Sequence, residues 1–228
     1  MRWLINFLSS SLGQKIIMSL TGLFLISFLT VHLAGNLTLM YNDDGYAFNT
    51  YAYFMTNNPL IKTTSYGLYF FILLHAAQGL LIAFKNKMAR GTHGYAVKAK
   101  ENASFASKNM ALLGTLVLAF LFIHMGDFWL RMKLDWLPMI TYDDYPEPIA
   151  DLYGRVAMQF QNPLIVIAYV IGQIVLALHL WHGFQSAFQS LGLNHPKYTP
   201  LIRGLGKGYS ILIPAGFALI PIIHFLFK

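Results

Sequence analysis

Five histidines lie inside the first four long apolar stretches of this chain, and their side chains are the ones best suited to chemistry. They are His32, His75, His124, His179 and His182. An imidazole within a membrane is costly and is usually functional, as a metal ligand or as part of a proton pathway. A hydrogen bond between helices would explain any one of them. A histidine in each of four consecutive apolar stretches indicates a shared role.

Five apolar stretches hold these residues in place, and each is long enough to cross the bilayer. A helix rises about 1.5 Å per residue, and the hydrocarbon layer is about 30 Å thick. The stretches cover approximately Ile16–Met40, Ser65–Phe84, Met110–Leu130, Pro163–Phe188 and Tyr209–Phe227. Pro163 suits a helix start, whereas Pro214 and Pro221 should bend the fifth helix. We therefore expect an all-α, up-and-down bundle of five transmembrane helices, with residues 1–228 forming one integral membrane domain.

The composition supports a membrane protein and excludes several other classes. Of the 228 residues, 56% are hydrophobic and only 11% are charged, which is too little charge to cover a soluble domain of this size. The strands of an outer-membrane barrel would alternate in polarity, and this chain does not. Because the chain has no cysteine, it cannot hold an iron–sulfur cluster or a thiolate zinc site. The first stretch lacks a small-residue cleavage site, so we expect an uncleaved anchor.

The formal net charge of +7 is distributed unevenly between the connections. The N-terminus and the second and fourth connections are basic, through Arg2, Lys15, Lys85, Lys87, Arg90, Lys98, Lys100, Lys108, Lys197, Arg203 and Lys207, with Glu101 as the opposing acid. The acids of the other connections are Asp43, Asp44, Asp127, Asp135, Asp143, Asp144, Glu147 and Asp151. By the positive-inside rule the N-terminus is cytoplasmic and the C-terminus is outside. The basic charge therefore indicates topology, and we expect no nucleic-acid partner.

The first outer connection, Tyr41–Lys62, is rich in aromatic residues. Tyr46, Phe48, Tyr51, Tyr53 and Phe54 are typical of an interfacial belt, which a short surface helix would carry. Lining a lipophilic ligand site is the alternative interpretation.

The depths of four histidines sort them into two pairs. At helical rise, His32 and His124 each lie about 24 Å beyond the inner end of an outward-running helix. His75 and His179 lie about 20 Å and 25 Å from the outer ends of inward-running helices. Two imidazoles facing each other across four helices match bis-histidine haem ligation. The two levels differ by roughly 15 Å, which suits two stacked haems passing electrons across the membrane.

A zinc or di-iron site is the competing use of these histidines. Such a centre normally recruits carboxylates, and the nearest one, Asp127, sits only near the outer end of the third stretch. The absence of a carboxylate well inside any apolar stretch favours haem over a zinc or di-iron centre. Small residues beside the histidines would let a flat macrocycle lie against the helices; they are Ala34, Gly35, Ala76, Gly79, Gly126 and Gly183.

The sequence also bears on the choice between His179 and His182 and on the histidines outside the two pairs. His179 and His182 are three residues apart on one helix side, and only one of them can face the iron squarely. His93 and His195 fall in basic loops, where we expect them to be solvated. His224, near the end of the fifth stretch, is interpreted as structural or as facing a quinone pocket.

Four sequence blocks at these histidines resemble a known family. The blocks are Val31–Leu33, His75–Leu80, His124–Trp129 and His179–Phe184, with further similarity at Ser11–Met18 and Gly192–Pro196. Their order and spacing resemble the cytochrome b subunit of succinate dehydrogenase and fumarate reductase, in its single-chain, five-helix, di-haem form that uses menaquinone. The resemblance covers nearly the whole chain.

The resemblance implies that His32, His75, His124 and His179 are the axial ligands of two haem b groups. The family has a glycine four residues after the last ligand, and Gly183 matches that position only if His179 is the ligand. The helices that bind haem would be the first four. The chain would carry electrons to a quinone and would hold no catalytic residue for succinate itself.

The resemblance also implies partners and a location. A flavoprotein and an iron–sulfur subunit, belonging to the tricarboxylic acid cycle, would dock on the cytoplasmic face of a bacterial inner membrane. The basic segments Lys85–Lys108 and Leu191–Lys207 are suitably placed to meet them, and a higher oligomer of the complex is compatible with this arrangement. No acid flanks His179, unlike in some fumarate reductases, which favours succinate oxidation while leaving the direction open.

Several polar residues are secondary candidates for the same chemistry. Asp127, Asp43 and Asp44 are candidates for protonating the quinone, although acids at a helix end are more often solvated caps. Lys15, Arg131 and Lys133 are candidates for pairing with haem propionates, although basic side chains at this depth more often reach to lipid headgroups.

Two other functions remain open at this point. A cytochrome b561-like reductase would share the haem but would not associate with flavoprotein and iron–sulfur subunits. A haem-free transporter with histidines along its path would purify colourless.

Overall fold

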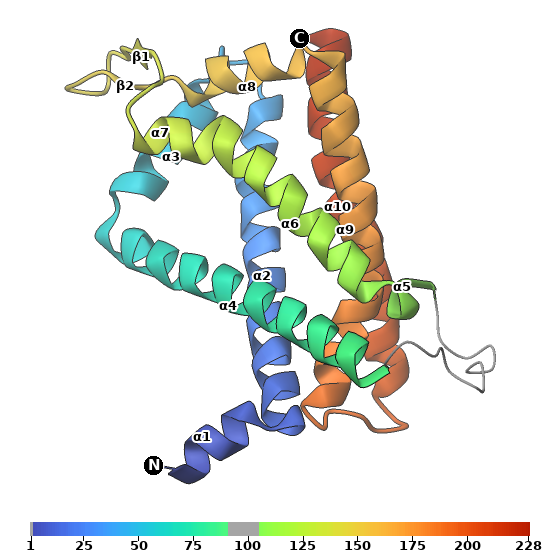
Figure 1. Cartoon of the computed structure of the whole chain (residues 1–228). Coiled ribbons are helices and arrows are strands. Elements are labelled where there is room, and N and C mark those ends of the chain that lie inside the picture. Colours follow the sequence, from blue (N-terminus) through green and yellow to red (C-terminus); the bar gives the residue numbers. More distant parts are fainter. Residues whose placement is uncertain (1, 91–104) are drawn as a thin grey trace. The chain divides into compact units, whose positions relative to one another are not determined.

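The computed structural model describes residues 2–90 and 105–228, and these residues are overwhelmingly helical (Figure 1). The helices are α1 (Arg2–Ser9), α2 (Ser11–Asn36), α3 (Tyr46–Asn57), α4 (Pro59–Arg90), α5 (Phe105–Lys108), α6 (Met110–His124), α7 (Arg131–Lys133), α8 (Leu152–Phe160), α9 (Pro163–Ser190) and α10 (Thr199–Phe227). A 3-10 helix, η1 (Leu37–Met40), follows α2, and a π-helical turn, η2 (Met125–Leu130), joins α6 to α7. The strands β1 (Met139–Ile140) and β2 (Ile149–Ala150) pair as an antiparallel hairpin.

Five helical segments of the described chain are long and apolar enough to cross a membrane. They are Ser11–Met40, Pro59–Ala89, Met110–Lys133, Pro163–Ser190 and Thr199–Phe227. The predicted all-α, multi-pass character is thus confirmed. Each helix extends beyond the apolar stretch that predicted it, because a helix can continue into the headgroup region with polar side chains on its surface. Helix α9 begins at Pro163, as expected, and α10 continues through both Pro214 and Pro221.

Internal contacts divide the chain into two compact units. Unit 1 comprises Met1–Phe28, Leu68–Val117 and Val175–Ile211, and unit 2 comprises Leu29–Gly67, Leu118–Ile174 and Leu212–Lys228. Each unit contains a segment of all five long helices.

The hydrophobic core of unit 2 forms where the short helices and the hairpin pack on the long ones. Its buried members are Leu39, Phe48, Leu137, Leu152, Val156, Phe160, Val166, Tyr169 and Ile220. Helix α3 contacts both α8 and β2 (Figure 1). The aromatic residues of α3 therefore divide between two roles: Phe48 enters this core, whereas Tyr53 and Phe54 remain exposed.

Asn49 is the polar centre of this region and is only 1% exposed. Its side-chain nitrogen donates to the hydroxyl of Tyr142 at 3.1 Å and to the Asp151 carboxylate at 2.9 Å. Its oxygen accepts from the backbone N–H of Tyr153 at 2.8 Å. Asp151 in turn caps α8 by accepting from the N–H of Gly154 at 2.8 Å. One buried amide thus connects α3 to the start of α8 and to the segment carrying Tyr142.

Tyr46 makes a second connection to the same region. Its hydroxyl donates to the carboxylate of Asp144. This hydrogen bond raises the pKa of Tyr46 to about 12, with the negative charge of Asp144 contributing. Both residues are polar anchors at the exposed side of unit 2.

Candidate functional site

In unit 2, the imidazoles of His32 from α2 and His124 from the end of α6 face each other. Their ring centroids are 5.7 Å apart and the ring planes are nearly perpendicular, at 82°. Phe217 of α10 lies 5.4 Å from His32, and Phe120 stacks on His124 at 5.9 Å. The edge of Tyr169 approaches His124 from α9 at 6.1 Å. Aromatic rings therefore pack around the pair, in which both histidines are half-buried.

In unit 1, His75 of α4 faces His179 of α9, with ring centroids 6.4 Å apart and an interplanar angle of 71°. The ring in contact with His75 is thus that of His179; His182, one turn further along, is half-buried. Glycines of two other helices lie behind the rings. A Cβ at Gly22 would lie 3.4 Å from Cε1 of His75, and one at Gly114 would lie 3.6 Å from Cε1 of His179. These helices can approach the imidazoles closely because neither position carries a side chain.

The spacing within each pair matches two imidazoles on opposite sides of one metal ion. A metal–imidazole bond of about 2.0 Å and a ring radius of about 1.1 Å place the two centroids about 6 Å apart. The observed separations are 5.7 Å and 6.4 Å. The structure thus brings together the same two pairs that the depths indicated; that each pair binds haem iron stays a prediction.

No family model, curated protein or solved structure matches the chain. The assignment of a function therefore depends on the residues of these two sites.

The donor set of each site favours haem over zinc. Protein zinc sites use three or four ligands from the chain, whereas a bis-histidine haem needs only two. Within residues 2–90 and 105–228 no group of three or more His, Asp or Glu side chains is placed to hold a metal ion. Each pair offers only its two imidazoles, which is the number that an iron already held by four porphyrin nitrogens accepts.

The hydrogen bonds of Nδ1 decide which nitrogen of His75 is available as a ligand. The hydroxyl of Thr21, a residue only 2% exposed, lies 3.0 Å from His75 Nδ1. That hydroxyl already donates to the carbonyl oxygen of Ile17 at 2.8 Å, so it accepts from His75. We infer from this network that the proton is on Nδ1, which leaves the Nε2 lone pair free for a metal.

The surroundings of Nδ1 differ among the other three histidines. Nδ1 of His124 and Nδ1 of His179 are buried without a hydrogen-bond partner in the described part of the chain. Nδ1 of His32 lies 3.3 Å from the side-chain nitrogen of Asn36, one turn along α2. Because an amide nitrogen only donates, Nδ1 of His32 is the acceptor in this contact, and His75 is the histidine whose hydrogen bonds assign the proton to Nδ1.

The small residues expected beside a macrocycle do not all have that role. A Cβ at Gly35 would overlap the ring of Tyr51, so this glycine accommodates α3, and its interpretation as a haem-facing position is wrong. A Cβ at Gly79 would lie 3.4 Å from the methyl group of Met18. No described atom lies within 4 Å of a Cβ added at Gly126 or Gly183, so open space lies beside both glycines.

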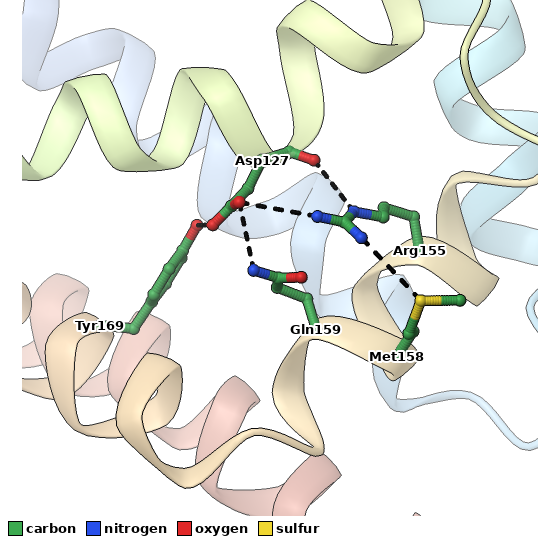
Figure 2. A network of polar contacts seen from close by, with 5 residues as sticks. All are labelled: Asp127, Arg155, Met158, Gln159 and Tyr169. Carbon is green, nitrogen blue, oxygen red and sulfur yellow. Dashed lines mark hydrogen bonds and ion pairs between the residues drawn. The ribbon is translucent and has the colours of Figure 1, made fainter.

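Asp127 is the centre of a polar network beside the unit 2 pair (Figure 2). It lies in the π-helical turn η2, a type of turn that is frequent at functional sites. Its carboxylate accepts from Gln159 at 3.1 Å and from the hydroxyl of Tyr169 at 3.4 Å. It also forms an ion pair with Arg155 at 3.6 Å. Tyr169 touches both this network and the ring of His124, so a single side chain links the carboxylate to the imidazole pair.

The basic residues of the network are partly withdrawn from water. Burial lowers the pKa of Arg155, the positive charge of Arg131 lowers it further, and Asp127 opposes both effects. Nε of Arg131 is buried without a hydrogen-bond partner among the described residues. Arg155 thus pairs with Asp127 while the charge of Arg131 acts on the same guanidinium, and pairing of Arg131 with a haem propionate stays a prediction.

The remaining predicted residues have simpler surroundings. Asp43 accepts from the N–H groups of Gly45 and Ala47 at 3.2 Å and 2.9 Å, so it caps α3. Its neighbour Asp44 is exposed and has a positive φ of 52°. Lys15 is also exposed. These surroundings leave quinone protonation and propionate binding by these residues as predictions.

The histidines outside the two pairs are placed as follows. His195 is exposed in its loop and stacks on Tyr198, with ring centroids 5.3 Å apart. His224 is fully buried and contacts the rings of Tyr153 and Phe160. Its Nδ1 lies 3.0 Å from the carbonyl oxygen of Ile220. His93, Lys98, Lys100 and Glu101 lie outside the described residues.

The variant Thr21→Val tests the role assigned to the Thr21 hydroxyl. Valine keeps the shape but removes the acceptor for His75 Nδ1, and the loss of such an outer contact typically weakens metal-site affinity by about 10–100-fold. We expect one haem per chain to dissociate more readily, measured as haem retained after passage over apomyoglobin. Thr115→Val is the matched control, because the Thr115 hydroxyl is exposed and bonds only within its own helix. Equal retention of haem in both variants would contradict the role of Thr21.

Proposed function

We propose that this chain is the di-haem cytochrome b membrane anchor of a succinate:quinone oxidoreductase. In this function it carries electrons from an iron–sulfur subunit to a quinone, menaquinone by family resemblance. The observation that carries the proposal is the meeting of two imidazoles from different apolar helices in each unit, at 5.7 Å and 6.4 Å between ring centroids. The sequence blocks at the same four histidines support it independently.

His32 and His124 hold one haem b in this proposal, and His75 and His179 hold the other. Bound haem supplies one-electron transfer at a potential set by its axial ligands and by its burial. Thr21 keeps the proton on Nδ1 of His75 and so fixes the orientation of that ring. The protein thereby provides fixed ligands that do not have to move when an electron arrives.

The polar network around Asp127 has a separate role in the proposal. Reduction of a quinone consumes two electrons and two protons, so a proton source is needed near the quinone. Asp127 and the Tyr169 hydroxyl form a hydrogen-bonded pair beside the unit 2 imidazoles, and Gln159 and Arg155 hold the carboxylate in place. We assign this network to holding a proton on the outer side of the membrane.

The orientation and partners follow from the charge pattern and the resemblance. The N-terminus is on the cytoplasmic side of a bacterial inner membrane, and the flavoprotein and iron–sulfur subunits dock on that face. The basic connections between α4 and α6 and between α9 and α10 supply the docking charge. Succinate oxidation is the direction favoured by the absence of acids beside His179.

A reduced-minus-oxidised spectrum with haem quantification on the purified chain tests the proposal. We expect a b-type spectrum and two haems per chain. A single haem would contradict the two-site assignment, and a colourless protein would favour a histidine-lined transporter. Purification of the tagged chain from its native membrane should also recover flavoprotein and iron–sulfur subunits. A di-haem chain recovered without them would indicate a b561-like reductase instead.

A further inference from the structure

A polar cavity of about 310 Å³ lies in unit 2, apart from the imidazole pair. Helix α3 contributes Tyr53 and Asn57, the start of α4 contributes Lys62, and Lys133 and Asp135 come from α7 and the residues after it. Ligand pockets typically measure about 300–1,000 Å³, so the cavity has room for a small polar group.

The charge of this cavity favours an anion. Lys62 and Lys133 both line it, against the single carboxylate of Asp135. Among the described residues the ion pair of Asp127 and Arg155 is the one formed, so neither lysine is neutralised by a carboxylate within the structure. Asn57 and Tyr53 add polar side chains to the lining. An oxyanion would therefore find two ammonium groups with no competing internal partner.

The position of the lysines along their helices places the cavity at the membrane surface. Lys62 stands at the beginning of the membrane-spanning segment Pro59–Ala89, and Lys133 is the last residue of Met110–Lys133. The phosphate groups of lipids lie at this level, just outside the hydrocarbon layer. Two lysines at the ends of spanning helices are thus at the depth of the headgroups.

Apolar side chains next to the lysines are available to lipid tails. Leu60 is 76% exposed two residues before Lys62, and Phe54 is 54% exposed next to Tyr53. A free phosphate ion would gain nothing from these side chains, whereas an acyl chain would cover them. The combination of a cationic polar cavity and flanking exposed apolar residues therefore favours a lipid over a soluble anion.

We propose that this cavity binds the phosphate group of an anionic phospholipid, with Lys62 and Lys133 as its cationic contacts. The inference is independent of whether the imidazole pairs bind haem. A lipid held here would contact α3, α4 and α7 together, and so would hold the surface elements of unit 2 in place.

Native mass spectrometry of the delipidated full chain in detergent tests the proposal, with dioleoyl phosphatidylglycerol as the probe. Near a membrane surface each lysine contributes enough to an anionic contact that losing two should weaken binding about 30-fold. We therefore expect Lys62→Gln/Lys133→Gln to lose most of the bound phosphatidylglycerol, and Lys62→Arg/Lys133→Arg to retain it. The matched control Lys15→Gln/Lys85→Gln removes the same charge from exposed positions outside the cavity and should bind like the original chain.

Competition identifies the source of the phosphate. Zwitterionic phosphatidylcholine should bind much more weakly than phosphatidylglycerol, and inorganic phosphate should not displace the lipid. Equal binding by the glutamine variant and the control would overturn the proposal, and so would displacement by inorganic phosphate. Retention of a quinone in place of phosphatidylglycerol, lost in the glutamine variant, would also overturn it, because the cavity would then belong to the electron-transfer site.

Discussion

Replacement of His124 by alanine is expected to reduce the haem content from two per chain to one. His124 and His32 face each other within unit 2, whereas His75 and His179 meet within unit 1, so each pair can be removed separately. His32→Ala should remove the same haem as His124→Ala, and His75→Ala and His179→Ala should remove the other. The double variant His32→Ala/His124→Ala should retain one haem, while His32→Ala/His75→Ala should retain none. Haem per chain, measured as the pyridine haemochromogen, gives the count.

His182→Ala is the matched control, because it removes an imidazole one turn from His179 on the same helix. This variant should retain two haems, since the ring contact to His75 comes from His179. Loss of a haem in His182→Ala, with two haems retained in His179→Ala, would show that the ligand has been misassigned. Loss of both haems in either His124→Ala or His179→Ala would contradict the independence of the two sites.

Replacement of Asn49 by leucine is expected to destabilise the chain by about 3 kcal/mol, because each buried polar partner left unsatisfied costs about 1–3 kcal/mol. Leucine is branched at Cγ like asparagine but is larger, so the change removes the hydrogen bonds without creating a cavity, and overpacking adds to the cost. The backbone N–H of Tyr153 loses its hydrogen-bond acceptor, and Asp151 and Tyr142 each lose a hydrogen-bond donor. The free energy of unfolding in mixed micelles, followed by circular dichroism, measures the effect.

Thr50→Ala on the same helix is the comparison for Asn49→Leu. The Thr50 hydroxyl bonds only to carbonyl groups of α3 itself, so its removal should change the free energy of unfolding by less than about 0.5 kcal/mol. If Asn49→Leu behaved like Thr50→Ala, the amide would not be the connection between α3 and α8 that its hydrogen bonds indicate.

The long helices were predictable from the sequence because they depend on local properties. An apolar run that must cross hydrocarbon has to satisfy its own backbone, and only a helix does so within one segment. The helix ends were less predictable. Lys85 and Lys87 were placed in a connection by their charge, yet both belong to α4, since a charged side chain at the headgroup level does not end a helix.

The pairing of the histidines was predictable for a related reason. The rise per residue converts sequence position into depth, and residues at equal depth on neighbouring helices can meet. The contacts around the pairs were not predictable in this way. Thr21, Arg155, Gln159 and Tyr169 reach the site by the rotation of a helix about its axis or by the packing of a short helix, and neither follows from depth.

Gly35 is a second case in which the sequence did not identify the contacting residue. Its position beside His32 suggested that it makes room for a macrocycle, and a glycine does indicate a close approach. The partner of that approach, however, is Tyr51 of α3. A glycine in a sequence predicts that something lies near its backbone but does not identify what.

The π-helical turn at Met125–Leu130 sets the register of everything that follows it. A turn of this kind holds one residue more than an α-helical turn, so deleting a single residue here would restore a regular helix. The residues on either side of the turn would keep their orientation, because the wide turn absorbs the extra residue, whereas the residues inside it would move. A one-codon deletion would therefore leave His124 and Arg131 in register while removing the wide turn that carries Asp127, so the imidazole and the contacts of its acidic neighbour with Arg155 and Tyr169 can be separated genetically.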